Sequence, residues 1–244
     1  KILAVSENFY SMEFIDSKPL SKIYKSGTIY KLLNWTHKNL WSSKVDIDLN
    51  LFKESCLKFY KDKTLSRIKK GLEEKTIVDY SKINGCFIED IYSMMEKIDF
   101  NFLSDGQPGY FHGDFILDNI LIKGDKFVLI DWRENFGGNK EYGDIYYDLA
   151  KLRHNIFFNH ENINNNMFEI KMNNENVIVD MKCNFFLINQ LGEFEKFVRE
   201  YKYDLRKIKI ITSLIWINMA PLHSFPLSNF LFNLGKYNLF LSLQ

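Results

Sequence analysis

The stretch "YFHGDFILDNILIKGDKFVLIDW", residues 110–132, places one His, four Asp and one Asn among Ile, Leu, Val and Phe. Its apolar runs "NILI" and "KFVLID" indicate two strands, and "KGD" between them predicts a turn that reverses the chain. Asn119 and Asp131 should therefore lie at the same open end of a hairpin. A turn with an odd number of loop residues would put them directly opposite, whereas a two-residue turn offsets them by one.

These polar residues have the chemistry of a phosphoryl-transfer site. An amide oxygen beside a carboxylate suits Mg²⁺, which takes few protein ligands and completes its shell with phosphates and water. Asp114 stands five residues before Asn119, on a loop introduced by His112 and Gly113, and can reach the same opening. A carboxylate beside a metal and phosphates can orient a substrate hydroxyl and accept its proton.

The same residues carry a family resemblance. His112, Asp114 and Asn119 stand as H-x-D-x-x-x-x-N, and "IDW" follows. This pair resembles the phosphotransferase motifs of the aminoglycoside phosphotransferase and choline kinase family, a small-molecule branch of the protein-kinase-like fold. "GDIYYDLAKL" is similar to the acidic segment of that family, and "FYSMEFIDSKPL" is similar to the strand and hinge between its two lobes. Together these segments cover most of residues 8–155.

The resemblance implies a role for each residue of the motif. Asp114 would be the catalytic base, and Asn119 and Asp131 would hold Mg²⁺ beside ATP. His112 is expected to fix the shape of the loop through hydrogen bonds and not to touch the substrate. The implied activity is ATP-dependent phosphorylation of a hydroxyl on a small molecule.

Further polar residues are expected around this motif. Asp144 is predicted to cap the following helix, and Asp148, one turn later, to accept hydrogen bonds from the backbone of the Asp114 loop. Arg133 and Glu134 directly follow the metal-binding carboxylate, so their side chains should open near the acceptor. The alternative for Arg133 and Glu134 is a surface ion pair.

The resemblance also implies where the adenine of ATP is held, namely by the backbone of Glu13, Phe14 and Ile15. The nucleotide lobe of the family carries a phosphate-covering loop and an ATP-contacting Lys upstream of this hinge, and "GGNK" lacks the spacing of a P-loop. We therefore expect residues 1–20 to be the end of a nucleotide lobe with its hinge, and 21–244 to be a helical phosphotransferase lobe with the catalytic loop and acceptor site. The rest of the nucleotide lobe is expected upstream in the same polypeptide.

Apolar spacing along the remaining chain predicts an α+β, protein-kinase-like fold. A mostly helical C-terminal lobe would carry the metal-site β-hairpin, with a remnant of the nucleotide-lobe sheet at the amino end. "KILAV" and "NFYSMEFI" indicate a hairpin or two neighbouring strands, and "MFEIKMNNENVIVDM" indicates a further hairpin. Helices are predicted over 28–41, 51–72, 87–100, 142–158, 184–203, 205–219 and 227–240. The helix over 51–72 is expected to carry lysines on its outer face.

Composition excludes several other classes of protein. The 244 residues are 46% hydrophobic and 26% charged with a formal net charge of +1, which leaves no excess of basic residues for nucleic acid. The longest apolar stretch, "IITSLIWINMAPL", falls short of the roughly 18 to 20 residues that span a bilayer, so no membrane partner is expected. Cys56, Cys86 and Cys183 lie far apart, which predicts a reduced, cytoplasmic setting.

The acceptor is expected to be a sugar or an amino alcohol. "DWRENFGGNKEYGDIYYDLAKL" looks like the bacterial branch of the family that serves surface-polysaccharide pathways, and Arg133 argues against the acidic pocket that a polycationic antibiotic needs. The aromatic residues of the last 60 positions are expected in the core, although a choline-type substrate would want an aromatic cage. The histidines outside the motif, His37, His154, His160 and His223, show no ligand spacing and receive no role.

Three other functions stay open at this point. The chain could be a catalytically silent kinase-like module that binds nucleotide or a partner, although the presence of Asp114, Asn119 and Asp131 together argues against this. It could be an interaction domain of a larger enzyme, or an aminoglycoside-type antibiotic kinase. Nucleotide binding with and without Mg²⁺ would separate the silent module from the kinases.

Overall fold

Helices predominate in an α+β architecture, as the sequence predicts. The computed structural model describes residues 2–23, 25–124, 126–173, 175–182 and 185–244. Its helices are α1 (Leu20–Ile23), α2 (Thr28–Thr36), α3 (Leu49–Leu57), α4 (Lys63–Glu73), α5 (Ile91–Glu96), α6 (Phe100–Ser104), α7 (Ile145–Phe157), α8 (His160–Asn164), α9 (Phe185–Glu200), α10 (Leu205–Met219) and α11 (Leu227–Leu243). A π-helical turn, His37–Trp41, extends α2, and a second, Lys58–Asp62, joins α3 to α4.

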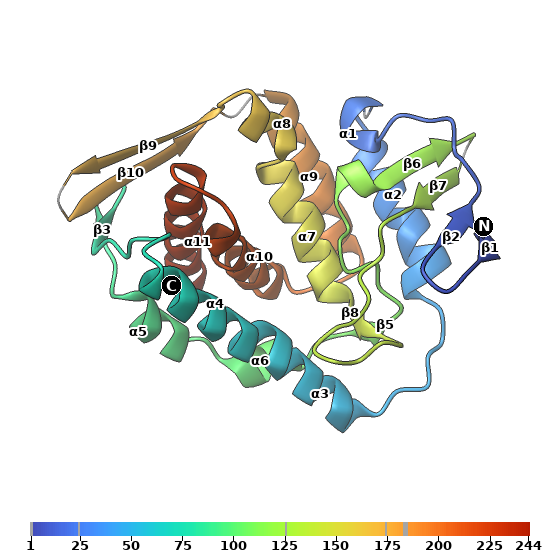
Figure 1. Ribbon diagram of the computed structural model, residues 1–244, viewed down its shortest axis with the longest axis horizontal. Helices are drawn as coiled ribbons and strands as arrows, with labels where there is room; N and C mark the ends of the chain where they lie inside the picture. Colours follow the sequence, from blue (N-terminus) through green and yellow to red (C-terminus); the bar gives the residue numbers. More distant parts are fainter. Residues whose placement is uncertain (1, 24, 125, 174, 183–184) are drawn as a thin grey trace.

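The strands form small sheets around the helices (Figure 1). Three two-stranded sheets are β1 (Ile2–Val5) with β2 (Tyr10–Met12), β5 (Pro108–Gly109) with β8 (Gly143–Asp144), and β6 (Ile120–Lys123) with β7 (Lys126–Leu129). A four-stranded sheet has the order β4 (Cys86–Phe87), β3 (Lys82–Ile83), β10 (Asn176–Met181) and β9 (Phe168–Asn173). The hairpins predicted at the amino end, at 120–131 and at 167–181 are all present.

The core lies among the long helices. Figure 1 shows α7 near the centre of the molecule, with α10 beside it and α3 and α4 along one side. α10 begins at Asp204, whose carboxylate accepts a hydrogen bond from the Lys207 N–H. Trp216 on this helix and Phe230 and Phe232 on α11 have no exposed surface. Most of the late aromatic residues that the structure describes therefore pack in or against the core, as expected, whereas Phe186 and Phe225 are exposed.

The single helix predicted over 87–100 is wrong. Phe87 belongs to β4, and two short helices, α5 and α6, follow. Asp90 and Asp99 each accept hydrogen bonds from backbone N–H groups at the start of one helix, so each begins a new helix instead of continuing one. The apolar spacing across the two short helices resembles that of one longer helix.

The amino-terminal hairpin presents apolar side chains to solvent. Ile2, Leu3, Val5 and Phe9 are between 62% and 79% exposed. Within the described residues, no helix is both long enough and apolar enough to cross a bilayer.

Candidate active site

The loop between β5 and β6 carries the central motif. The His112 side chain is fully buried; its Nε2 lies 2.8 Å from the Ile130 carbonyl oxygen, and its Nδ1 accepts a hydrogen bond of 3.2 Å from the Asp114 N–H. Gly113 has a φ of +79°, and a Cβ there would lie 2.4 Å from Cβ of Arg133. Only glycine fits this position, so the loop reaches Asp114 in close contact with the chain after β7.

One edge of α7 holds this loop along its length. Asp144 accepts from the Gln107 N–H at 3.0 Å, and Asp148 accepts from the N–H groups of His112 and Gly113, both at 2.7 Å. Two turns further along α7, Asn155 accepts from the Leu117 N–H at 3.0 Å. Asp144 also caps α7, and Asp148 makes the backbone contacts predicted from the sequence.

The two aspartates of α7 are fully buried. Burial raises the pKa of Asp144 to about 6, against the opposing hydrogen bonds from Gln107, Tyr60 and Tyr146. Burial also raises the pKa of Asp148, against the influence of His112 and Gly113 and a hydrogen bond of 3.1 Å from the Trp41 indole. Both carboxylates face the protein interior, so they position the loop and do not reach a ligand.

Asp114 is the carboxylate that faces the open side. Its Oδ1 lies 2.7 Å from Nζ of Lys151, and its Oδ2 accepts a hydrogen bond of 3.1 Å from Nδ2 of Asn119. Burial opposes ionisation of Asp114, but Lys151, Arg133 and Asn119 outweigh it and hold its pKa below the ordinary value. Asp114 is therefore ionised at neutral pH and about one-third exposed.

The register of the β6–β7 hairpin settles the relation between the two predicted metal ligands. Lys123 pairs with Lys126, so the turn has two loop residues; Asp125 of this turn lies outside the described residues. Asn119 accepts a backbone hydrogen bond from Ile130, the residue before Asp131. Asn119 and Asp131 are offset by one position, which is the second of the two arrangements expected.

The donor atoms of these two residues fit a hard cation. Asn119 donates hydrogen bonds from Nδ2 to the backbone carbonyl oxygen and to Oδ2 of Asp114. Within the described residues, the Asn119 Oδ1 accepts no hydrogen bond. Asp131 is exposed, has a left-handed φ of 60°, and its carboxylate has no partner among these same residues. Both oxygens are thus available for Mg²⁺. No group of three or more His, Cys, Asp or Glu side chains in the described residues could hold a metal.

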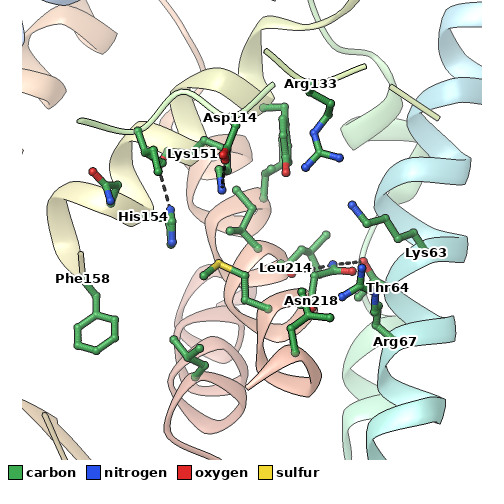
Figure 2. Close-up of a pocket in the computed structure, with 18 of the residues that line it drawn as sticks. Lys63, Thr64, Arg67, Asp114, Arg133, Lys151, His154, Phe158, Leu214 and Asn218 are labelled. Carbon is green, nitrogen blue, oxygen red and sulfur yellow. Dashed lines mark hydrogen bonds and ion pairs between the residues drawn. The ribbon is translucent and has the colours of Figure 1, made fainter. Parts of the chain in front are cut away.

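A cleft of about 370 Å³ opens beside Asp114, between α4, α7 and α10 (Figure 2). Arg133 lines it, and its Nε donates a hydrogen bond of 3.1 Å to the Gly113 carbonyl oxygen. Glu134 is exposed and is not among the lining residues. Of the two residues expected near the acceptor, only Arg133 reaches the cleft.

The sequence analysis missed several residues of the cleft. Lys63 and Arg67, placed with the outer lysines of their helix, point into the cleft in Figure 2. Lys69 and Lys70 do lie on the outer face, where they pair with Glu73 and Glu74. The i, i+4 spacing of Lys63 and Arg67 is the signal that could have separated them from their neighbours.

Two residues of α7 were missed as well. Lys151 stands three positions after Asp148, and this spacing puts it on the same helix face. His154, which received no role, also lines the cleft; burial lowers its pKa to about 3, with Lys151 adding to the effect, so it is neutral.

The predicted adenine segment follows β2. Glu13 forms an ion pair with Lys123 of β6, Phe14 is 85% exposed, and Ile15 is half-buried. Shortly after, Pro19 pairs with Leu121. The segment therefore lies against the β6–β7 hairpin, and its contact with adenine stays a prediction.

Comparison with known proteins places this motif in a described family. Residues 88–164 match the model of the phosphotransferase enzyme family. The match includes the whole H-x-D-x-x-x-x-N motif and confirms the resemblance seen in the sequence. No curated protein matches the chain. Among solved structures, an ethanolamine kinase of Plasmodium vivax matches 99% of this chain with 18% identity and a TM-score of 0.47, and this chain spans 66% of that one.

Proposed function

We propose that this chain transfers the γ-phosphoryl group of Mg·ATP to a hydroxyl group of a small molecule. The observation that supports this most directly is the setting of Asp114. It is ionised, it faces a cleft of small-molecule size, and its two oxygens are held by Lys151 and Asn119. The family match over residues 88–164 agrees with this chemistry.

The residues divide the work of the reaction. Asp114 would accept a hydrogen bond from the acceptor hydroxyl, orient it and take its proton as the new O–P bond forms. Lys151 would keep the carboxylate from rotating away. Asn119 and Asp131 would hold Mg²⁺, which when bound neutralises charge on the phosphates. Because phosphoryl transfer has a loose transition state, orientation by Asp114 matters more than its basicity.

We also propose that the backbone of Glu13, Phe14 and Ile15 contacts the adenine, and that an upstream domain of the same polypeptide completes the nucleotide site. The exposed apolar side chains of the β1–β2 hairpin support this, since a covering segment would bury them. The free thiols of Cys56 and Cys86 agree with a cytoplasmic location.

For the acceptor we propose a sugar or an amino alcohol, with a place in bacterial surface-polysaccharide synthesis. Arg133 at the cleft favours the sugar. An aminoglycoside would need acidic side chains, and of the described lining residues only Asp114 is acidic. A silent kinase-like module and an interaction domain of a larger enzyme are the remaining alternatives.

The test is to incubate the protein with Mg·ATP and a panel of small alcohols and to detect phosphorylated product by phosphorus NMR. We expect a phosphate ester that depends on both Mg²⁺ and Asp114. Mg²⁺-dependent ATP binding without any phosphorylated acceptor would identify the silent module. Absence of nucleotide binding in a chain extended upstream would contradict the whole proposal.

A further inference from the structure

The cleft carries more positive charge than phosphoryl transfer by Asp114 requires. Among the described residues that line it, the positively charged ones are Lys63, Arg67, Arg133 and Lys151, and the negatively charged one is Asp114. Lys151 is paired with Asp114. Lys63, Arg67 and Arg133, which we call the basic wall, form no ion pair within the described part of the chain.

The contacts of the basic wall leave donors free. Lys63 Nζ lies 4.0 Å from the centroid of the Phe59 ring, and the Arg133 guanidinium lies 5.4 Å from the same centroid. Arg67 donates one hydrogen bond of 3.2 Å, from Nη1 to the Asn218 carbonyl oxygen. An arginine has five N–H donors, so each guanidinium keeps N–H groups available for a ligand.

Grouping these cations is unfavourable for the protein alone. Burial, and then the positive charges of Arg133, Arg67 and Lys151, lower the pKa of Lys63 to about 7. Asp114, which is paired with Lys151, is the one carboxylate among the described lining residues, so the cations of the cleft exceed the negative charge that could offset their mutual repulsion. Such perturbed groups in a cleft are typical of functional sites. A bound anion would supply the missing charge.

This anion is distinct from the triphosphate of ATP. The proposed metal ligands Asn119 and Asp131 flank the β6–β7 hairpin. Arg133 lies on the same side as they do, whereas Lys63 and Arg67 belong to α4. In Figure 1 the hairpin and α4 lie on opposite sides of α7. Figure 2 shows Asp114 on one side of the cleft and Lys63 and Arg67 on the other. An acceptor in the cleft would therefore have its reacting hydroxyl at Asp114, between the metal site and the anionic group held by Lys63 and Arg67.

We propose that the basic wall binds an anionic group, phosphate or carboxylate, on the acceptor, which is then a charged alcohol such as a sugar phosphate or a sugar acid. This inference rests on the proposed function and narrows its acceptor. The planar fork of an arginine pairs with both kinds of anion. A cationic amino alcohol would be repelled by the same residues.

The first test measures binding without turnover. Sulfate, a dianion with the shape of a phosphate group, is titrated by calorimetry into the full chain with the nucleotide site filled by Mg²⁺ and a non-hydrolysable ATP analogue. We expect saturable binding that Lys63→Met with Arg67→Gln weakens on the order of 10- to 100-fold. The matched control is Lys69→Met with Lys70→Gln on the outer face of α4. Equal weakening in the control, or binding that the analogue abolishes, would overturn the basic wall as an acceptor site.

The second test compares acceptors of one size and different charge: a hexose, its phosphate, the hexuronic acid and the amino hexose. We expect kcat/KM to be highest for the phosphate or the acid and lowest for the amino sugar, with the preference lost in the Lys63→Met, Arg67→Gln protein. Faster phosphorylation of the neutral or amino sugar would refute the anionic acceptor and leave the kinase activity standing. Sulfate binding with no phosphorylation of any alcohol would instead refute the proposed kinase activity, while the proposal that the basic wall binds an anion would stand.

Discussion

Lys151 Nζ lies 2.7 Å from Asp114 Oδ1. The positions of both residues depend on α7, since Lys151 belongs to this helix and Asp148, three residues earlier, holds the backbone just before Asp114. The pair fixes one carboxylate oxygen, and Asn119 fixes the other. Asp114 thus has a defined orientation before any ligand binds. This preorganisation is the basis of the first two predictions.

Asp114→Asn should lower kcat by a factor on the order of 10² to 10⁴, because the amide cannot take the proton of the acceptor hydroxyl. Nucleotide affinity should change little. Steady-state kinetics with calorimetric nucleotide binding checks both expectations, and Asp180→Asn, on an exposed position of β10, is the control. Unchanged kcat in Asp114→Asn would remove this residue from the reaction.

Lys151→Met should lower kcat on the order of 10- to 100-fold, since Asp114 loses the partner that orients it and small misplacements of a reacting group are costly. Lys151→Arg keeps the charge and should retain more activity. Lys22→Met, which removes an exposed ion pair with Glu161, serves as the control for loss of a lysine. Equal activity of Lys151→Met and the parent would show that the ion pair has no part in turnover.

Asp131→Asn should raise the Mg²⁺ concentration needed for nucleotide binding. Asparagine suits the left-handed backbone at this position and removes only the charge, so folding should be unaffected. Nucleotide titrations at several Mg²⁺ concentrations measure the effect. A Mg²⁺ dependence identical to that of the parent would place the metal elsewhere.

Asp148→Ala should destabilise the fold by about 2 to 5 kcal/mol, because it leaves the N–H groups of His112 and Gly113 and the Trp41 indole without an acceptor. Trp41→Phe removes only one of these hydrogen bonds and should cost about 1 kcal/mol. Urea unfolding followed by circular dichroism compares the two. A smaller loss in Asp148→Ala than in Trp41→Phe would contradict the role of this carboxylate.

Sulfate should stabilise the protein more at pH 6 than at pH 8. The pKa of Lys63 is lowered to about 7 by burial and by Arg133, Arg67 and Lys151, so its positive charge is present below that pH and lost above it. Of the other ionisable groups that line the cleft, Asp114 stays ionised and His154 stays neutral in this window, while His160 is common to the parent and to Lys63→Met. Thermal unfolding with and without sulfate measures the difference, which should be smaller in Lys63→Met than in the parent.

The Lys63 side chain should also affect the free energy of unfolding in the absence of sulfate. Between about pH 7 and the ordinary lysine value of 10.5, the unfolded chain binds a proton on Lys63 that the folded chain does not. Stability should therefore rise with pH across this window in the parent relative to Lys63→Met. A parent curve parallel to that of the variant would show that the lysine titrates normally.

The sequence predicted the centre of the site better than its surroundings. Asp114, Asn119 and Asp131 could be read as one motif because their spacing is local, and the hairpin predicted between the last two is present, while their roles stay predictions. Lys63 and Arg67 could not be linked to this motif from the sequence, because α4 lies far from it in the chain and borders the cleft through tertiary packing, including its contact with α10. Apolar periodicity shows which face of a helix packs in the core. It does not show which of the polar residues beside that face border a cleft.

The prediction of a single helix over 87–100 was wrong for a related reason. Asp90 and Asp99 can cap a helix or lie on its exposed face, and the apolar pattern does not distinguish these cases. The surrounding chain decides, since Ile91 also donates its N–H to Asp79. Such a contact between distant parts of the sequence has no local signature.

The edge of α7 that carries Asp144, Asp148, Lys151 and Asn155 engages the loop at successive points from Gln107 to Leu117. Two stretches of chain that are matched in this way tolerate changes of sequence more easily than changes of length. Inserting or deleting one residue between Gln107 and Leu117 would shift every later partner by one place along the helix. Relatives of this protein should therefore vary in length at the β6–β7 turn and keep a constant spacing within this loop.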